Sequence, residues 1–215
     1  MRLYTFFRSS AAYRTRIALG LKGLPFESVP RHLRRGGGEH RKPDYLAANP
    51  HGLIPALEVD GAVIGQSVAI MEYLEERWPE PPLLPANAID RARVRSMVQL
   101  VACDIHPLNN LRVVNYLRDR LNQPEETINA WYRHWIAEGF TSLEAQVMSF
   151  GGARRFCFGD RVTMADVCLV PQIYNARRFG CDLAPYPTLT EIGRHLEKIP
   201  AFSAAAPEAQ PDAEA

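Results

Sequence analysis

Two consecutive hydroxyls stand near the N-terminus, where an apolar run gives way to a helical pattern. The run from Leu3 to Phe7 stops at Arg8, and Ser9 and Ser10 follow directly. A helix N-terminus presents unpaired backbone N–H groups and a partial positive charge, so serines placed there are suited to holding an anion. Serine is also a favoured cap residue, so a simple N-cap at Ser9 or Ser10 is the alternative.

A second polar pair, Gln66 and Ser67, precedes another helical pattern. An amide and a hydroxyl beside free helix N–H groups can clamp a carboxylate, and Ser67 acting only as a cap is the alternative. Between the two polar pairs, Pro55 opens an expected strand, where proline needs a reason because it lacks an N–H. A cis Ile54–Pro55 bond would turn nearby backbone groups outward to pair with an extended peptide. A trans proline on an edge strand is the alternative.

The elements around these residues follow a β-α-β-α-β-β-α order typical of a small mixed α/β domain. Strands are expected at 2–7 and within 26–33, with a helix between them that ends near Gly23. A flexible glycine-rich loop and a short helix follow. Two apolar runs joined by Asp60-Gly61 then predict a hairpin, and Ser67 is expected to cap the next helix.

Strand patterns are not seen beyond the proline-rich stretch PEPPLLPANAID, which we interpret as a linker. Asp90 is expected to cap a long helix with Val94, Val98, Val101 and Ile105 on one face, kinked or ended at Pro107. Thr163 and Asp166 resemble a capping box, and the Ala/Pro/acidic tail is expected to be frayed. The expected division is 1–80, a linker over 81–89, and an all-helical domain over 90–215.

Composition excludes several classes of function. The 215 residues include 25 basic and 24 acidic side chains, so no broad basic surface for nucleic acid or an anionic membrane is expected. No apolar run approaches the ~18 residues of a membrane span, and no secretory signal is visible. The four cysteines form no CxxC pair and are typical of the reduced thiols of a cytoplasmic protein. They are Cys103, Cys157, Cys168 and Cys181.

Four stretches resemble zeta-class glutathione transferases: SSAAYRTRIALGLKG, NPHGLIPAL, GQSVAIMEYLEERWP and GDRVTMADVCLVPQIYNARRF. The resemblance spans Leu3 to about Phe202 and implies a thioredoxin-like α/β domain followed by an all-α helical domain. This class includes maleylacetoacetate isomerases and a bacterial branch of maleylpyruvate isomerases. The resemblance also implies glutathione as the cofactor, a homodimer, and a role in the breakdown of aromatic compounds such as tyrosine.

The resemblance assigns glutathione contacts residue by residue. Ser9 is expected to hydrogen-bond the glutathione sulfur, with Ser10 close to it. Many members carry cysteine at the next position, but this chain has Ala11, so any role of that thiol is absent. The other contacts that the resemblance implies are His40 to the glycine end, Ile54 with a cis Pro55 to the cysteinyl unit, and Gln66 with Ser67 to the γ-glutamyl carboxylate. His106 and Asn110, near the expected kink, are further candidates to line the cleft.

The implied reaction needs a thiolate and a site for carboxylates. Addition of the thiolate to a maleyl double bond allows rotation, and its expulsion leaves the fumaryl isomer, so glutathione is not consumed. Such substrates carry two carboxylates, which favours arginines in the pocket. Arg8 is the leading candidate for this catalytic site, and a surface or ion-paired role is the alternative for the helical arginines Arg112, Arg177 and Arg178. Arg14 and Arg16 are expected to be structural, on the surface or paired with acids.

Two rival functions remain open on the sequence alone. A conjugating transferase acting on α-haloacids or other electrophiles needs the same thiolate. A non-catalytic glutathione-fold binding protein is disfavoured by the intact set of Ser9, Pro55, Gln66 and Ser67. No metal site is expected, because Asp104 and His106 are two residues apart and do not share a helix face.

Overall fold

The computed structural model describes residues 1–150 and 155–214. The chain divides into two compact units, one of Met1–Leu83 with Lys198–Ala215 and one of Leu84–Glu197. The expected division placed everything after residue 90 in the helical domain. The structure instead groups the C-terminal residues with the first unit, because α9 (Pro200–Ser203) packs on α1 (Ser10–Leu21). Phe202 of α9 is fully buried, and its carbonyl accepts a hydrogen bond from Tyr13.

The first unit is built on a four-stranded sheet in the order β2-β1-β3-β4. Its strands are β1 (Arg2–Thr5), β2 (Glu27–Pro30), β3 (Ala56–Val59) and β4 (Ala62–Gly65). β1 pairs with β2 in parallel and with β3 antiparallel, and β3 pairs antiparallel with β4. The expected hairpin is confirmed, and both Asp60 and Gly61 of its turn have positive φ, as a two-residue turn of type I′ requires.

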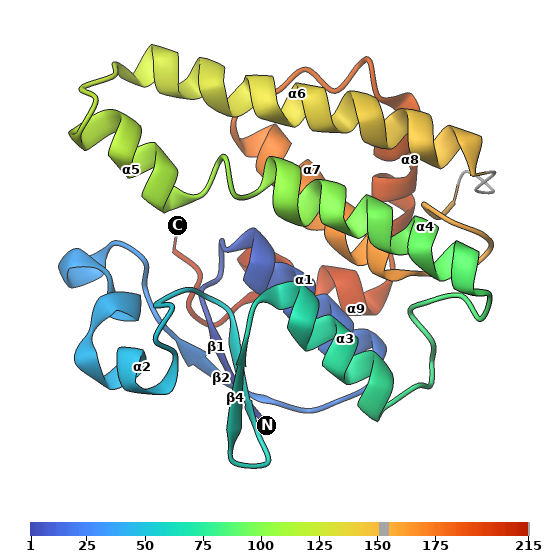
Figure 1. Ribbon diagram of the computed structural model, residues 1–215, viewed down its shortest axis with the longest axis horizontal. Coiled ribbons are helices and arrows are strands. Elements are labelled where there is room, and N and C mark those ends of the chain that lie inside the picture. The colour runs from blue at the N-terminus through green and yellow to red at the C-terminus, as the bar shows by residue number, and fades with distance from the viewer. Residues whose placement is uncertain (151–154, 215) are drawn as a thin grey trace. The chain divides into compact units, whose positions relative to one another are not determined.

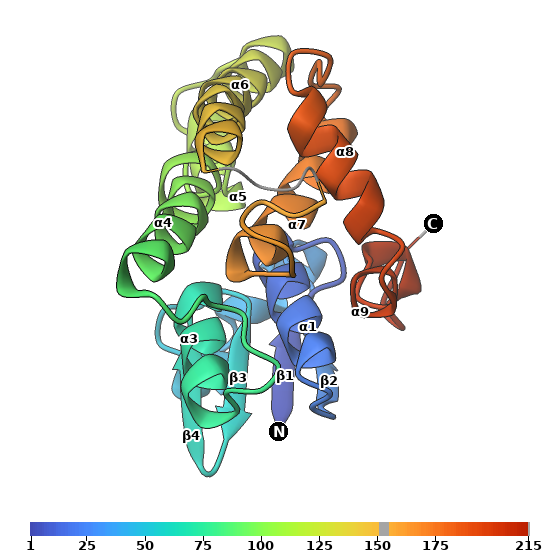
Figure 2. The same ribbon diagram turned by 90° about the vertical axis from the view of Figure 1, so that its right-hand side faces the viewer.

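Helices cover both faces of this sheet. α1 and α3 (Ser67–Arg77) lie on one face, and α2 (Pro43–Ala48) lies on the other (Figures 1 and 2). Two short 3₁₀ turns, Arg35–Gly37 and Glu39–Arg41, precede α2. The predicted β-α-β-α-β-β-α order is therefore confirmed. The sequence pattern marked only one face of α1 as apolar, whereas every residue from Ser10 to Leu19 is buried.

The C-terminal segment of the first unit is ordered as far as residue 214, the last one described, so the expectation of a frayed tail is wrong for residues 204–214. Ala205 and Pro207 are buried, and a 3₁₀ turn spans Pro207–Ala209. Beyond this turn, the Asp212 carboxylate accepts a hydrogen bond from the backbone of Phe7. The segment, red in Figure 1, runs back past the end of β1.

The second unit is helical throughout its described secondary structure. Its elements are α4 (Ala88–Gln99), a π-helical segment (Leu100–Ile105), α5 (Leu111–Asp119), α6 (Glu125–Ser149), α7 (Met164–Arg178) and α8 (Pro187–Leu196). The predicted apolar face from Val94 to Ile105 is buried, and the helix ends ahead of Pro107. Asn87 caps α4, not Asp90 as expected, because its side-chain oxygen accepts the N–H groups of Ile89 and Asp90.

The predicted capping box at the start of α7 is confirmed. Asp166 is fully buried and accepts hydrogen bonds from Thr163 and from the backbone N–H of Cys157. Burial raises the pKa of Asp166 to about 6, although these hydrogen bonds oppose the shift. All four cysteines are free. Within the described ranges, no helix is long and apolar enough to cross a membrane.

Candidate functional site

Ser9 and Ser10 lie at the junction of β1 and α1. Ser9 is the N-cap of α1, with extended backbone, and its Oγ accepts the N–H of Ala12 at 3.2 Å. Ser10 is the first helical residue and is buried. Because the Ser9 oxygen serves as an acceptor toward the helix, its hydroxyl proton can be donated to a ligand. The Ser9 side chain can therefore cap the helix and donate a hydrogen bond to an anion at the same time.

Arg8 brings a positive charge to the same junction. Its side chain is half-buried, and its guanidinium lies 4.8 Å from the ring centroid of Phe7 and 6.0 Å from that of Phe6. Contacts of this kind with aromatic rings restrict the guanidinium while leaving its N–H donors available.

Gln66 and Ser67 lie at the start of α3, and the cap is one residue earlier than expected. Gln66 is the N-cap, with φ of 67° and ψ of 117°, and its carbonyl accepts the N–H of Ile70. Ser67 is the first helical residue and is buried, so the expectation that it caps the helix is wrong. A non-glycine residue with such a φ is uncommon, and strained backbone of this kind gathers at ligand sites.

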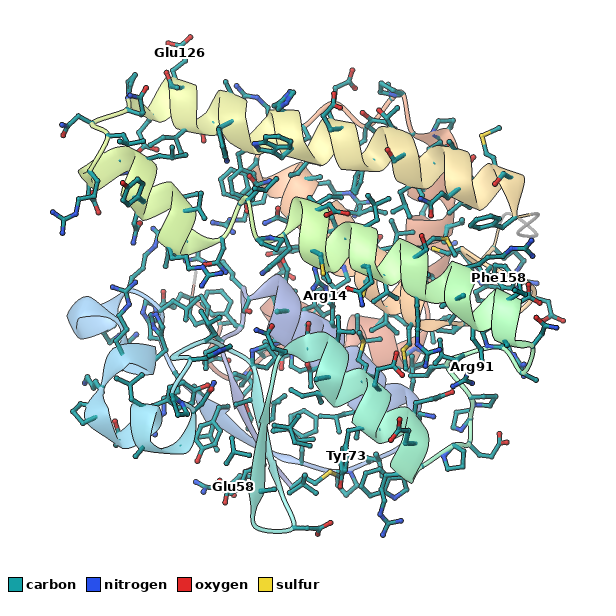
Figure 3. The ribbon with its side chains drawn as sticks, viewed as in Figure 1. Arg14, Glu58, Tyr73, Arg91, Glu126 and Phe158 are labelled. Atoms are coloured by element: carbon teal, nitrogen blue, oxygen red, sulfur yellow. The ribbon has the colours of Figure 1, made fainter. Side chains whose placement is uncertain are left out.

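Arg14 connects the two helix starts. It is 1% exposed, and its Nη1 lies 3.5 Å from Ser67 Oγ. Figure 3 shows Arg14 on α1, next to the first turn of α3. The expectation that Arg14 lies on the surface is wrong, and one of its hydrogen-bond partners is a hydroxyl of the candidate site. A charged donor behind Ser67 orients that hydroxyl and adds positive charge beside the helix N-terminus.

The Ile54–Pro55 bond is cis, as expected, and lies just before β3. The loop before it is held by two side chains of the α2 region that sequence reasoning missed. Tyr45 donates to the Leu53 carbonyl at 2.5 Å, and Asn49 donates to the same oxygen at 2.9 Å. Their spacing of four residues was the available signal, because it places both on one side of a helical turn.

His40 is buried in the 3₁₀ turn that follows the three glycines. Burial and then the charge of Arg41 lower its pKa, against a hydrogen bond to the backbone of His32. The imidazole is therefore neutral at pH 7. Gly38 has φ of 99°, and a Cβ there would lie 2.6 Å from His40 Cε1, so this glycine is needed for the histidine's position.

The sheet register brings these four chain segments to one end of the first unit. Ala56, the first residue of β3, pairs with both Tyr4 and Gly65. The chain leaving β1 toward Ser9, the loop entering β3, and the chain leaving β4 therefore share one end of the sheet. Thr5 pairs with Pro30, so the chain toward His40 leaves β2 at the same end.

The second unit holds the remaining candidates. His106 follows the π-helical segment and is half-buried, and Asn110 caps α5 by accepting the N–H of Arg112 at 3.1 Å. The Arg112 side chain is exposed. Residues of α6 hold the turn that contains His106 and Asn110: Trp131 donates to the Leu108 carbonyl at 2.9 Å, and Asn109 donates to the Tyr132 carbonyl at 3.1 Å.

Arg177 and Arg178, adjacent at the end of α7, have different surroundings. Arg177 forms an ion pair with Glu197, with Nη1 and Oε1 2.6 Å apart. The Arg178 guanidinium lies 4.8 Å from the Phe179 ring centroid, and Phe179 stacks on Tyr132 at 3.6 Å. Burial raises the pKa of Tyr132, and Arg178 is one of the groups that oppose this shift. Arg178 is thus held against an aromatic pair, and Arg177 is held by an acid.

Comparison with known proteins finds relatives that match along the whole chain. Residues 8–77 match the family model described as glutathione S-transferase, N-terminal domain. A probable maleylacetoacetate isomerase of Vibrio cholerae is 49% identical, over 98% of this chain and 97% of that protein. A holo structure of maleyl pyruvate isomerase, described as a bacterial zeta-class glutathione S-transferase, is 46% identical with a TM-score of 0.94 over the whole of both chains. A maleylacetoacetate isomerase of Methylobacterium extorquens AM1, solved with bound malonate and GSH, is 42% identical with a TM-score of 0.94, again over both whole chains.

Proposed function

Because the chain belongs to the zeta-class glutathione S-transferase family, we propose that it is a glutathione-dependent isomerase that converts maleyl acids into their fumaryl isomers. Maleylacetoacetate and maleylpyruvate are the two candidate substrates, as they are in the names of the relatives. The reaction belongs to the breakdown of aromatic compounds. The observation that carries the proposal is the position of Ser9, a hydroxyl donor at the N-terminus of a buried helix, in a chain so similar to these isomerases along its whole length.

The residues at the end of the sheet fit glutathione. Its sulfur is assigned to Ser9 and Ser10, its cysteinyl backbone to Ile54 beside Pro55, and its γ-glutamyl carboxylate to Gln66 and Ser67. An extended peptide with a carboxylate at each end matches this combination of open backbone, helix N-terminus and buried hydroxyls. His40 is assigned to the glycine carboxylate.

Bound glutathione supplies a thiolate that adds to the cis double bond and is later expelled, so it is regenerated in each cycle. The role of the protein is to keep that sulfur anionic and to hold the diacid. Ser9 donates its hydroxyl proton to the sulfur, and the N-terminus of α1 adds a partial positive charge. Both effects lower the pKa of a thiol that otherwise titrates near 8.5.

Arginines are assigned to the carboxylates of the substrate. Arg8 is adjacent to Ser9, and its charge also favours the negative charge that develops on the substrate. Arg112 and Arg178 are the candidates in the helical unit. Arg177 is left out of the substrate site, because its guanidinium is paired with Glu197. His106 and Asn110 are retained as cleft candidates.

A homodimer and a cytoplasmic location complete the proposal. The family resemblance supports the dimer, and four cysteines without a disulfide fit a reducing compartment.

The test is to mix purified protein with each maleyl acid and to follow the absorbance of that acid. One reaction contains glutathione and the other contains S-methylglutathione. We expect turnover to the fumaryl isomer with glutathione and none with the methylated form, which has no thiol. Conversion at equal rates with S-methylglutathione would overturn the proposal. Comparison of kcat/KM for the two acids then identifies the preferred substrate.

A further inference from the structure

A buried arginine donates hydrogen bonds to the strand–helix junction that carries Ser9. Arg16, 3% exposed, donates to the hydroxyl of Thr5 at 3.0 Å and to the carbonyls of Phe6 and Phe7 at 3.4 and 2.9 Å. The expectation that Arg16 lies on the surface is wrong, because its guanidinium is buried and donates to backbone carbonyls, with Asp212 as an acidic neighbour.

The C-terminal segment binds both this junction and Arg16 itself. Asp212 Oδ2 accepts the N–H of Phe7 at 3.0 Å, and Arg16 Nε donates to the Ala205 carbonyl at 3.0 Å. Gln210 holds the segment in shape by donating to the carbonyls of Ala204 and Ala206, both at 2.9 Å. Phe7 thus has its N–H held by Asp212 and its C=O held by Arg16.

These contacts reach Ser9 through one further hydrogen bond. The N–H of Ser9 donates to the Phe6 carbonyl at 3.0 Å, and that carbonyl also accepts from Arg16. A carbonyl oxygen is the negative end of a dipole and opposes an anion placed nearby. Donation from a charged guanidinium offsets that effect and fixes the direction in which the carbonyl points. Burial lowers the pKa of Arg16 to about 10, with Asp212 opposing the shift, so the guanidinium remains charged at neutral pH.

We propose that Arg16 and Asp212 are positioning residues for the thiolate site. The segment from Ala205 to Asp212 is then needed to hold that site in its active geometry. This inference rests on the proposed function, because the anion toward which Ser9 is oriented is the glutathione sulfur. Neither side chain is assigned a contact with glutathione. They act by holding Phe6 and Phe7, and therefore Ser9, in the orientation in which its hydroxyl meets the sulfur.

Glu214 provides a matched control in the same segment. Its carboxylate pairs with Arg35 at 2.8 Å and approaches His32 at 3.3 Å, and both Glu214 and Arg35 are exposed. An exposed pair of this kind contributes little to stability. Glu214 bonds side chains and not the backbone of Phe6, Phe7 or Ser9, and its link toward the junction runs through the ring of His32, whose centroid lies 4.9 Å from that of Phe6.

The experiment measures the pKa of bound glutathione by thiolate absorbance in wild type, Asp212→Ala, Asp212→Asn and Glu214→Gln. We expect Asp212→Ala to raise that pKa by about half a unit, a roughly threefold loss in the ratio of thiolate to thiol. Asp212→Asn keeps an oxygen acceptor for the N–H of Phe7, so the pKa of bound glutathione should stay close to the wild-type value. Glu214→Gln should leave that pKa unchanged. Thermal melts report whether each variant is folded.

A wild-type pKa in Asp212→Ala, with or without a lower melting temperature, would overturn the inference and leave the proposed function intact. An equal shift in Glu214→Gln would overturn it too, because the effect would then belong to the charge of the tail. If wild type itself does not lower the pKa of glutathione, the thiolate site fails and this inference fails with it.

Discussion

Arg14 and Ser67 meet between α1 and α3, with Nη1 of the arginine 3.5 Å from Oγ of the serine and both side chains buried. The contact links the helix that begins at the proposed sulfur site to the helix that begins at the proposed γ-glutamyl site. We therefore expect Arg14 to affect glutathione binding without touching the reacting atoms.

The first prediction is that Arg14→Met weakens glutathione binding about three- to tenfold, the range expected for a weakened hydrogen bond from a charged donor. The rate at saturating glutathione should stay close to wild type. Isothermal titration gives the affinity and steady-state kinetics give the rate. Arg77→Met, at the exposed far end of α3, is the control and should change neither. A large fall in saturated rate with unchanged affinity would place Arg14 in the chemical step instead.

The second prediction concerns the sulfur. Ser9→Ala should raise the pKa of bound glutathione by about 1–2 units, because a hydrogen bond to a charged group contributes about 1.5–3 kcal/mol. It should also cost about 1 kcal/mol of stability through loss of the N-cap. Ser9→Thr keeps both the cap oxygen and the hydroxyl, so it should preserve the pKa. An unchanged pKa in Ser9→Ala would transfer the role to Ser10 or to the helix N-terminus.

A third prediction uses the depressed pKa of His40. His40 is neutral at pH 7, and a carboxylate placed beside it favours its charged form. Binding of S-methylglutathione, which has no titratable thiol, should therefore take up a proton and strengthen as the pH falls toward the lowered pKa of His40. Calorimetry in two buffers of different ionisation enthalpy measures this uptake. It should vanish in His40→Asn and persist in the exposed-site control His134→Asn.

The same pKa has a defined consequence for stability. In the unfolded chain His40 has its ordinary pKa near 6.5, so that state takes up the proton first as the pH falls. The contribution of the neutral, buried His40 is thus present above about pH 6.5 and is lost as the pH falls below it. A denaturation series should show a smaller loss between pH 7 and 5 for His40→Asn than for wild type. Equal losses would contradict the buried, neutral assignment.

The fourth prediction separates the two arginines that end α7. Arg178→Met should raise KM for a maleyl acid about tenfold or more, because it removes a charged partner of a substrate carboxylate. Arg177→Met should leave KM unchanged and cost at most about 1 kcal/mol of stability, the value of an exposed ion pair with Glu197. The reverse order of effects on KM would show that Arg177 leaves Glu197 to bind substrate.

Most elements of the fold could be predicted from local sequence patterns. The hairpin turn at Asp60-Gly61, the apolar face from Val94 to Ile105, and the capping box at Thr163 could all be predicted, because each depends on residues close together in the chain. The N-cap at Ser9 was foreseen for the same reason. The cis bond at Pro55 was predicted from the family resemblance, because the sequence pattern left cis and trans open.

The features that could not be predicted depend on contacts between residues that are far apart in the sequence. Asp212 and Phe7 are 205 positions apart, and nothing in an Ala/Pro/acidic tail indicates that it contacts the chain between β1 and α1. Arg16 appears in the sequence as an ordinary helical arginine, but the fold surrounds it with carbonyls. The shift of the α3 cap from Ser67 to Gln66 needs a positive φ that propensity assigns to glycine or asparagine.

The central claim is that glutathione is a cofactor and not a substrate. The most direct measurement is free thiol, determined with a thiol reagent, while the absorbance of a maleyl acid is followed to completion. With substrate in large excess over glutathione, we predict that all substrate is isomerised and that free thiol stays at its starting value. Loss of one thiol for each product molecule would show a conjugating transferase and would contradict the isomerase account.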